Sequence, residues 1–351
     1  MGVPSQRKYD KIHNANLDRY AYKVKKAYLK AVKEVASITY NLKLNDNNEF
    51  FFRNNKEVNR KINQVLKELY NDIYGTTASG ILTEWDLAVE KNNELAQWVF
   101  GKKITEIPIQ IKTKYFTNNS EARKAFVERK INGLNLSDRV WNLTQQFKEE
   151  LELSLELGIG KGKSADQLAR SVRQYLNEPD RLYRRVRNEN GELRLSKAAK
   201  AYNPGRGVYR SSFKNAQRLT RNENNIAYET SQYQKRQQQD FIVGIEIKTS
   251  PNHNPADDKG GISCINLQGK YPKDFDFTYK WHTSCLCSSF NILKTRAELD
   301  QDVDKILSGR KPDTKSKNEI TRNPKSFTGY LQDNKDKWVN WKNPPRFLVN
   351  Q

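Results

Sequence analysis

Imidazole and thiol side chains gather in one short stretch of this sequence. His282, Cys285 and Cys287 lie within six residues of one another, and Cys264 precedes them across a turn-forming segment, 269–272. Imidazole nitrogen and thiolate sulfur are preferred ligands of zinc, and a structural zinc takes four ligands in a tetrahedron. If segment 269–272 belongs to a hairpin, Cys264 completes the set. Cys264, His282, Cys285 and Cys287 are therefore candidate ligands of one structural zinc.

Two other interpretations of this cluster start from the same residues. In the first, the cysteines pack as small core residues and His282 makes an ordinary hydrogen bond. In the second, the cluster is catalytic. A zinc deaminase needs a glutamate two positions after the histidine and a Pro-Cys-x-x-Cys pair, whereas this chain has Ser284 and a Cys-x-Cys pair. A thiol hydrolase needs an orienting third group, and no nucleophile motif surrounds Cys285. If Leu286 lies in a strand, the thiols of Cys285 and Cys287 share one face.

A second candidate for chemistry is the glycine- and lysine-rich run 158–164. Its composition is that of a phosphate-binding loop, but its spacing is not, since that motif needs four residues between its first glycine and the closing Gly-Lys-Ser. We expect the glycines to end one helix and Ser164 to cap the next, whose apolar face is Leu168, Val172 and Tyr175.

A long polar helix must position the cysteine and histidine residues. Residues 211–240 contain neither Gly nor Pro, and the apolar stripe of the predicted helix consists of Ala216, Leu219, Ile226, Ala227 and Tyr233. Glu223 falls on this stripe, where a buried carboxylate needs a partner. We favour a structural ion pair with the arginine cluster 181–187 over a catalytic acid. Val243, Ile245 and Ile247 then alternate as in a half-buried strand.

The first 157 residues are predicted to be mainly helical. Apolar residues recur every three or four positions from Leu17 to Leu44 and again from Val58 to Ile73, and we expect Gly75 to end the second helix. Further helices are expected after a loose turn from Gly75 to Gly80. The expected segments are Leu82 to Val99, Glu121 to Ile131 and Ser137 to Leu157, with a short strand from Ile104 to Lys112.

The balance of charge points to a polyanionic partner. Lys and Arg number 62 against 41 Asp and Glu, which gives a net charge of +21. Binding a nucleic acid through such charges releases counterions from its phosphates, although a basic surface can also serve solubility alone. Two basic segments are candidate DNA contacts, a helix face and a turn-rich stretch, 179–209. Their basic residues are Lys23, Lys25, Lys26, Lys30, Arg181, Arg184, Arg185, Arg187 and Arg206.

The apolar runs, the cysteine count and the composition indicate the cellular compartment and the fold class. No apolar run approaches the roughly 20 residues of a spanning helix, the first residues lack the apolar core of a signal peptide, and the three cysteines do not form a secreted disulfide framework. We therefore expect a protein made in the cytoplasm and not bound to a membrane. With 36% apolar and 29% charged residues, we predict an α+β, predominantly helical fold: long amphipathic helices and a small β-hairpin module packed behind a long helix.

The ordered motifs of the central region resemble a known family. They are Asn215-Ala-Gln-Arg-Leu-Thr-Arg-Asn-Glu-Asn224, Ala227-Tyr228, the strand 243–248, Cys264 with Leu267-x-Gly269-Lys-Tyr-Pro272, and Trp281-His-Thr-Ser-Cys-Leu-Cys287. This order is similar to that of the phage Mu F-like head morphogenesis family. Thr283 and Leu286 replace a proline and an arginine of its usual closing motif, and segment 260–263 lacks the cysteine or aspartate that many members carry before Cys264. Arg218, Arg221, Glu223, Gly269 and Trp281 are the matching structural positions.

The resemblance implies a function and a division into domains. The family's minor capsid proteins lie inside the phage head near the portal and assist DNA packaging or ejection. We therefore expect a structural virion protein, not an enzyme, which contacts double-stranded genome DNA, portal and capsid proteins and takes no small-molecule substrate. The alternatives are an enzyme or toxin that carries such a module, and a free DNA-binding protein of a mobile element. The expected regions are a basic helical region (1–157), the Mu F-like domain (158–293) and a polar basic tail (294–351).

The predicted tail contains one short helix, Ala297 to Leu307, and a late cluster of aromatic residues. Phe327, Tyr330, Trp338 and Trp341 are interleaved with basic residues, a pattern that suits stacking on single-stranded bases. We favour the alternative that these rings anchor the tail on its own domain or on a neighbouring subunit.

Overall fold

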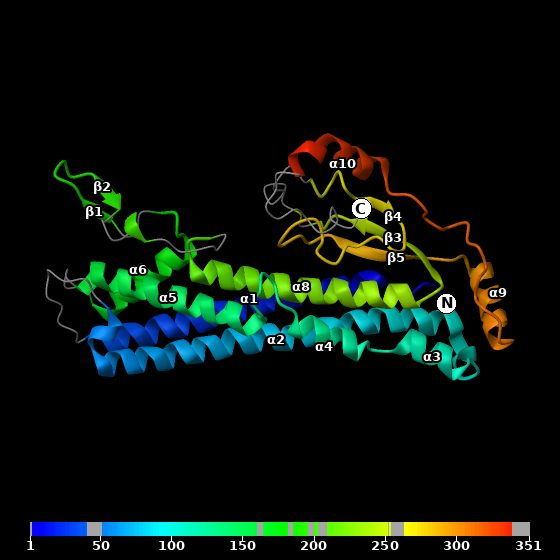
Figure 1. The fold of residues 1–351 in the computed structure, drawn as a ribbon, viewed down its shortest axis with the longest axis horizontal. Coiled ribbons are helices and arrows are strands. Elements are labelled where there is room, and N and C mark those ends of the chain that lie inside the picture. Colours follow the sequence, from blue (N-terminus) through cyan, green and yellow to red (C-terminus); the bar gives the residue numbers. More distant parts are fainter. Residues whose placement is uncertain are drawn as a thin grey trace. The chain divides into compact units, whose positions relative to one another are not determined.

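The computed structural model describes residues 2–40, 51–159, 164–181, 185–195, 200–202, 209–251, 253 and 263–338. Within these ranges the chain forms long helices and two small antiparallel sheets (Figure 1), which confirms the predicted α+β, predominantly helical fold class. The elements in chain order are α1 (Gln6–Thr39), η1 (Phe52–Asn54), α2 (Lys56–Phe100), η2 (Gly101–Thr105), α3 (Ile109–Phe116), α4 (Ser120–Glu128), α5 (Leu136–Ile159), α6 (Ala165–Asn177), β1 (Arg185–Arg187), β2 (Leu193–Leu195), α8 (Ser212–Gln238), β3 (Ile242–Lys248), β4 (Gly269–Tyr271), β5 (Ser288–Leu293), α9 (Arg296–Leu307) and α10 (Lys325–Trp338).

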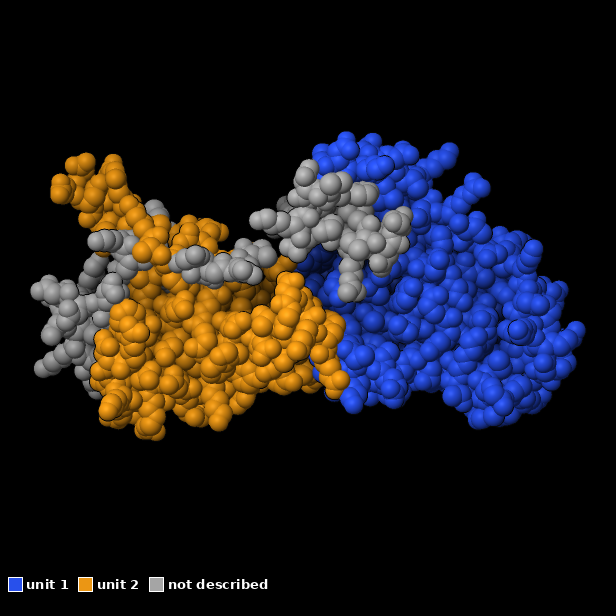
Figure 2. All heavy atoms as spheres, in the orientation of Figure 1, with its two compact units in different colours: residues 1–17, 80–127, 222–351 blue, residues 18–79, 128–221 orange. Residues whose placement is uncertain are grey.

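The chain divides into two compact units, each assembled from separate segments (Figure 2). Unit 1 consists of residues 1–17, 80–127 and 222–351, and unit 2 of residues 18–79 and 128–221. Helices α1, α2 and α8 supply residues to both units. The expected domain boundaries after residues 157 and 293 fall inside unit 2 and unit 1, respectively, so the compact units do not follow that division.

Unit 2 is a helical body with an aromatic centre. Tyr28 lies edge-on to Phe147 and Phe213, with ring centroids 5.0 and 5.4 Å apart. At the start of α8, the buried carboxylate of Glu150 accepts hydrogen bonds from the Ser212 backbone N–H (2.8 Å) and hydroxyl (2.6 Å). A carboxylate there pairs with unsatisfied N–H groups and with the positive end of the helix dipole. Glu150 therefore fixes the first turn of α8.

The predicted amphipathic helix near the N-terminus is present and longer than expected. Val24, Tyr28, Ala31 and Val35 are buried at the predicted three- and four-residue spacing. The helix starts at Gln6 rather than Leu17, because Asp10, His13 and Asn16 are buried polar residues that an apolar periodicity does not reveal. Residues 41–44 of the predicted helix lie outside the described residues.

The prediction that Gly75 ends a helix was wrong, and so was the loose turn from Gly75 to Gly80. Helix α2 runs through both glycines to Phe100. A glycine inside a helix costs only about 1 kcal/mol relative to alanine, and the buried residues Ile73, Ile81 and Trp85 on either side favour continuation. Gly80 also has a packing role, because a Cβ there would lie 2.6 Å from the side-chain oxygen of Asn224.

The expected strand from Ile104 to Lys112 is likewise wrong. These residues form η2 and the start of α3, with Pro108 at the N-cap of α3. Ile107 and Ile111 are four residues apart, a spacing that suits one face of a helical turn as well as an alternating strand. Ile107 is buried and Ile111 packs against the same apolar cluster of unit 1. The sequence pattern fits both a strand and a helix, and the packing of Ile107 and Ile111 on one apolar cluster favours the helix.

The long predicted helix and the strand after it are both confirmed. Helix α8 covers Ser212–Gln238, and β3 follows as the central strand of a three-stranded antiparallel sheet of order β4-β3-β5. Tyr271 of β4 and Asn291 of β5 flank Ile245 in register. Ser164 caps α6 as predicted, and it does so within a capping box with Gln167. A turn before Gly191, inside the turn-rich stretch 179–209, joins β1 to β2.

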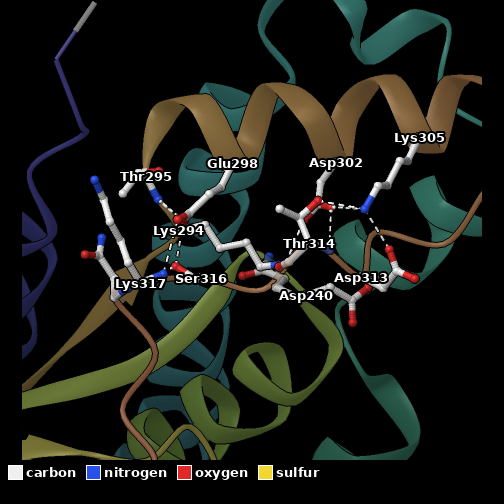
Figure 3. Close-up of polar contacts among 12 residues, drawn as sticks. Asp240, Lys294, Thr295, Glu298, Asp302, Lys305, Asp313, Thr314, Ser316 and Lys317 are labelled. Atoms are coloured by element: carbon white, nitrogen blue, oxygen red, sulfur yellow. Dashed lines mark hydrogen bonds and ion pairs between the residues drawn. The ribbon is translucent and has the colours of Figure 1, made fainter.

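Beyond β5 the chain is held closely on unit 1. Helix α9 confirms the predicted short helix, and residues 308–324, which we call the strap, then run from α9 to α10. Figure 3 shows how strap residues meet α9: Thr314 donates its backbone N–H to Asp302 (3.0 Å), and its carbonyl accepts a hydrogen bond from Lys294 (2.7 Å). Glu298 accepts from the Ser316 hydroxyl at 2.6 Å. The region expected to be a polar tail is therefore, up to residue 338, part of a folded unit.

The tail aromatics support the anchoring alternative. Phe327 is fully buried, with its ring centroid 5.5 Å from that of Tyr271 and 5.3 Å from that of Phe275. Tyr330 packs partly buried against the same cluster. Trp341 and the side chain of Trp338 lie outside the described residues.

Candidate metal centre

The cysteine and histidine residues come from two loops next to the three-stranded sheet. Cys264 lies in the turn that precedes β4, and His282 and Cys285 lie in a turn before β5, closed by a hydrogen bond from the Cys285 N–H to the His282 carbonyl (3.1 Å). Ser284 adopts a positive φ of 68° within that turn. Leu286 is not in a strand, since β5 begins only at Ser288. The turn, rather than a strand, brings the side chains together.

Three of the four predicted ligands form a compact group. The ligand atoms of Cys264, His282 and Cys285 all lie within 4.8 Å of one another. The Cys264 Sγ is 3.7 Å from the Cys285 Sγ and 3.1 Å from the His282 Nε2. A tetrahedral zinc with sulfur ligands at about 2.3 Å places two sulfurs about 3.8 Å apart and a sulfur and a nitrogen about 3.6 Å apart. The sulfurs are at the right separation, and the histidine would have to move outward by about half an ångström.

The orientation of His282 suits a ligand. Its Nδ1 lies 2.9 Å from the carbonyl oxygen of Thr283, so the ring donates its Nδ1–H there and directs the lone pair of Nε2 toward Cys264. Metal-bound histidines usually donate their second ring nitrogen to a carbonyl or carboxylate in this way. The donor set and the tautomer therefore both fit a zinc ion.

The three thiols share hydrogen bonds that separate their acidities. The pKa of Cys285 lies well below the usual range, because the Cys264 and Cys287 thiols donate to it. The pKa of Cys264 is raised by its hydrogen bond to Cys285. These hydrogen bonds therefore favour the thiolate form at Cys285, which is the form that binds a metal. Cys287, the fourth predicted ligand, is outside the 4.8 Å group but bonds to this thiolate.

This cluster is sealed inside the apolar core of unit 1. Cys264 is 0% exposed, and Cys285 and Cys287 are each 1% exposed. The surrounding core residues include Ile247, Leu267 and Trp281, and the Trp281 ring meets Phe277 edge-on at 5.0 Å. The three thiols have almost no accessible surface, whereas His282 is partly exposed. The arrangement can hold an ion or fill the core.

The other residues of the family-like motifs lie outside the cysteine and histidine cluster, each with contacts of its own. Glu223 is 1% exposed, as its stripe position predicted. Arg181, a member of the cluster proposed to pair with it, instead forms an ion pair with Glu178, and Arg187 donates to the Gly191 carbonyl (2.6 Å).

Arg221 pairs with Asp18, and burial lowers the pKa of Arg218. Gly269 of β4 makes room for the strap, since a Cβ there would lie 2.9 Å from Pro324.

The candidate DNA contacts are only partly described. Lys23, Lys25, Lys26 and Lys30 are exposed on α1, as expected for its polar face. Lys30 is 3.0 Å from the Glu68 carboxylate, which neutralises part of its charge. Arg184 and Arg206 and the side chain of Arg185 lie outside the described residues.

Buried polar groups around α8 were not anticipated. Lys91, whose side chain is 0% exposed, donates to Asp10 (2.9 Å) and to the Ser289 carbonyl (3.0 Å). His13 places its Nδ1 2.5 Å from the Glu84 carboxylate and its Nε2 2.9 Å from the Asn225 amide oxygen. Both ring nitrogens thus lie within hydrogen-bond distance of side-chain oxygens, one from α2 and one from α8.

A second group joins α8 to the loops of the sheet. Glu229 of α8 lies 3.4 Å from the Lys280 ammonium and accepts a hydrogen bond from the Ser289 hydroxyl (3.0 Å). The unusual number of charged and amide residues in 211–240 was the one sequence signal of these networks. The signal did not identify partners, because they come from distant segments.

Comparisons of this chain with protein-family models, with curated proteins and with solved structures found no match. The resemblance to the Mu F-like family thus stands on the sequence motifs. Among the residues that the structure describes, no helix combines the length and apolar character needed to cross a bilayer.

Proposed function

We propose that this chain is a structural minor virion protein of phage head morphogenesis, located inside the capsid near the portal and contacting packaged DNA during packaging or ejection. The observation that carries this proposal is the sealing of Cys264, Cys285 and Cys287 in the core of unit 1. Residue types that invite catalysis are used here to hold loops against a sheet. This placement favours a structural role over an enzyme or toxin, and the Mu F-like motif order supplies the phage context.

The DNA contact rests on charge. A net charge of +21 and the exposed lysines of α1 provide a sequence-independent attraction for phosphates, which weakens steeply with salt because counterions are released. We expect the full chain to be retained on duplex DNA at low ionic strength and to elute as salt rises.

A triple variant tests the α1 surface. Lys23→Gln, Lys25→Gln and Lys26→Gln together should reduce the salt slope of duplex binding by up to about three contacts. The matched control removes the same charge from the strap, at the exposed residues Lys311, Lys315 and Lys317. Equal losses in both variants would show that net charge alone is responsible, and no retention even at low salt would refute the DNA contact.

The resident cofactor of this proposal is one structural zinc. Cys264, His282 and Cys285 would hold it with Cys287 as the fourth ligand, and the ion would cross-link the loops before β4 and β5. Elemental analysis of the purified chain should give about one equivalent, lost in Cys285→Ser. A folded, metal-free chain that melts identically with and without chelator would refute the zinc while leaving the sealed cluster as a core element.

Proteomics of purified particles tests the location. The chain should be present in heads at low copy number relative to the main shell protein and should be recovered with the portal after mild disruption. A chain found only in the cell lysate, soluble and bound to DNA, would favour a free DNA-binding protein of a mobile element instead.

A further inference from the structure

A groove of unit 1 lies between α3, the C-terminal end of α9 and the first residues of the strap. Its volume is about 620 Å³, within the roughly 300–1,000 Å³ of typical ligand sites. Its lining residues come from segments 108–114 and 306–313 and include Asp240. Tyr115 of α3 and Ile306 of α9 belong to one apolar cluster, so core packing holds the two helical walls of the groove together.

The end of α9 and the start of the strap give the groove a fixed wall. Gly309 has a positive φ of 75°, and its N–H donates to the Ile306 carbonyl (3.0 Å). The Arg310 N–H donates to the Lys305 carbonyl (2.7 Å). These two bonds form the Schellman motif that ends many helices. The Nε of Arg310 also donates to the Ser308 hydroxyl (2.9 Å). A wall that is ordered in advance lowers the entropic cost of binding.

The apolar part of this wall is aliphatic and accessible. Pro108, Ile111 and Pro312 are each half-buried, so part of their apolar surface remains in contact with water. Covering such surface with an apolar ligand group is favourable. The described residues that line the groove include no aromatic ring, so a nucleic-acid base would find no stacking partner there. An aliphatic side chain of a partner protein is the better match.

The charges of the groove leave two cations unmatched. Oδ2 of Asp240 accepts a hydrogen bond from the Lys114 ammonium (2.7 Å), and Asp313 pairs with Lys305 at 2.7 Å, as Figure 3 shows. Each carboxylate is thus matched by one lysine. The two remaining cations are exposed and pair with no carboxylate in the described parts of the chain: Arg310 and Lys311. They favour a ligand that carries negative charge beside its apolar part.

We propose that this groove binds a peptide segment of a partner protein in which aliphatic side chains adjoin acidic residues. An aliphatic side chain of the peptide packs on Pro108, Ile111 and Pro312, and a neighbouring carboxylate pairs with Arg310. A guanidinium holds a carboxylate through two parallel hydrogen bonds, so Arg310 sets the position of the acidic residue and Lys311 adds attraction. This inference goes beyond the proposed function, because it depends neither on DNA nor on zinc.

The test uses the full chain and fluorescently labelled peptides, measured by anisotropy at about 0.15 M salt, where weak surface attraction is screened. The probe is Gly-Ser-Glu-Leu-Glu-Leu-Glu-Ser-Gly. One comparison peptide has serine in place of each leucine, and another has glutamine in place of each glutamate. We expect the probe to bind with a Kd of about 0.1 mM and each comparison peptide to bind about tenfold more weakly.

Two pairs of variants locate the binding. Arg310→Gln should weaken binding of the probe about tenfold. Its control, Arg322→Gln, removes the same charge from an exposed strap residue outside the groove and should leave binding unchanged. Ile111→Ala should weaken binding about fivefold. Its control, Ile109→Ala, shortens a 66% exposed side chain of α3 that does not line the groove and should leave binding unchanged. Melting curves verify that each variant is folded.

The outcomes decide between the groove, net charge and a nucleic-acid ligand. Equal binding of the probe and its serine counterpart, or equal losses in Arg310→Gln and Arg322→Gln, would show attraction to net charge alone and overturn the groove as the site. Absence of probe binding at about 1 mM would overturn it as well. Competition by oligo(dT) that disappears in Arg310→Gln would overturn the peptide in favour of a nucleic acid. None of these results changes duplex retention or the presence of the chain in particles, so a failure here is distinct from a failure of the proposed function.

Discussion

Replacing Gly244 by alanine tests whether the strap is an integral part of unit 1. The Ile320 N–H donates to the Val243 carbonyl of β3 (3.0 Å), so strap residue 320 lies directly against the strand. A Cβ on Gly244 would lie 2.7 Å from Ile320 Cγ1, 3.0 Å from Ile320 Cβ and 3.1 Å from the Tyr271 carbonyl oxygen. Two of these three atoms cannot rotate away, because they belong to a branch point and to the backbone of β4.

The expected loss follows from this crowding. Forcing a methyl group into a packed site costs typically 1–3 kcal/mol, so we expect Gly244→Ala to reduce the free energy of unfolding by about 2 kcal/mol. For a cooperatively unfolding unit of 150–250 residues, this loss corresponds to a decrease in melting temperature of roughly 4–8 °C. Ile320→Ala alone should cost about 1 kcal/mol, since its side chain is only half-buried.

A double-mutant cycle makes the test specific. Shortening Ile320 removes the 2.7 Å contact, so the double variant should lose about 1 kcal/mol less than the sum of the two single losses. Gly329→Ala is the matched control, because a Cβ there meets nothing within 4 Å. It lies in α10 and should stabilise the protein by about 0.5–1 kcal/mol. Urea unfolding that shows equal effects of the two glycine substitutions, or strict additivity in the cycle, would refute the packing of the strap on β3.

Three further substitutions test single groups. Hydrogen bonds from the Ser316 hydroxyl and the Thr295 N–H lower the pKa of Glu298 to about 2, so stability should fall as pH drops from about 4.5 toward 2, and Glu298→Gln should show a smaller fall in acid melting curves. Burial lowers the pKa of Lys235 to about 8. The folded state then binds fewer protons than the unfolded state between pH 8 and about 10.5. The free energy of unfolding of the wild type should therefore rise relative to that of Lys235→Met as the pH increases over this interval, measured by urea unfolding. A constant difference between the two proteins would contradict the lowered pKa of Lys235. Glu150→Gln weakens the carboxylate contact at the start of α8 and should cost about 1–2 kcal/mol, measured by thermal unfolding.

The parts of the fold that the sequence predicts are those set by local signals. The spacing of Val24, Tyr28 and Val35 identified α1, and Ser164 identified the start of α6. These patterns require no knowledge of partners. The prediction failed at Gly75, where a weak local stop is overruled by packing along α2.

In the candidate site, too, the features set by local sequence were predictable and those set by distant segments were not. Proximity of Cys264 to Cys285 was predictable from their short separation in sequence, but the expected hairpin was wrong, because β4 and β5 each pair with β3 and not with each other. The burial of the thiols was not predictable, since it depends on Phe327, which lies in α10, beyond α9 in the sequence. Glu84 and Glu229 gave no signal of burial either. Their partners lie in segments far away in the sequence, and charged residues are ordinarily assigned to the surface.

The polar character of α8 also bears on the proposed role. Asn224, Gln232 and Arg236 are at most 1% exposed in a helix whose charged and amide residues outnumber its aliphatic ones. The Arg236 guanidinium donates to the carbonyls of Lys273 and Phe275 at 2.8 and 3.0 Å. An apolar helix can slide by a residue or rotate with little loss, but such a shift here would leave buried charges without partners. We infer that these contacts fix one register of α8 against the sheet loops, which is consistent with the proposed structural role.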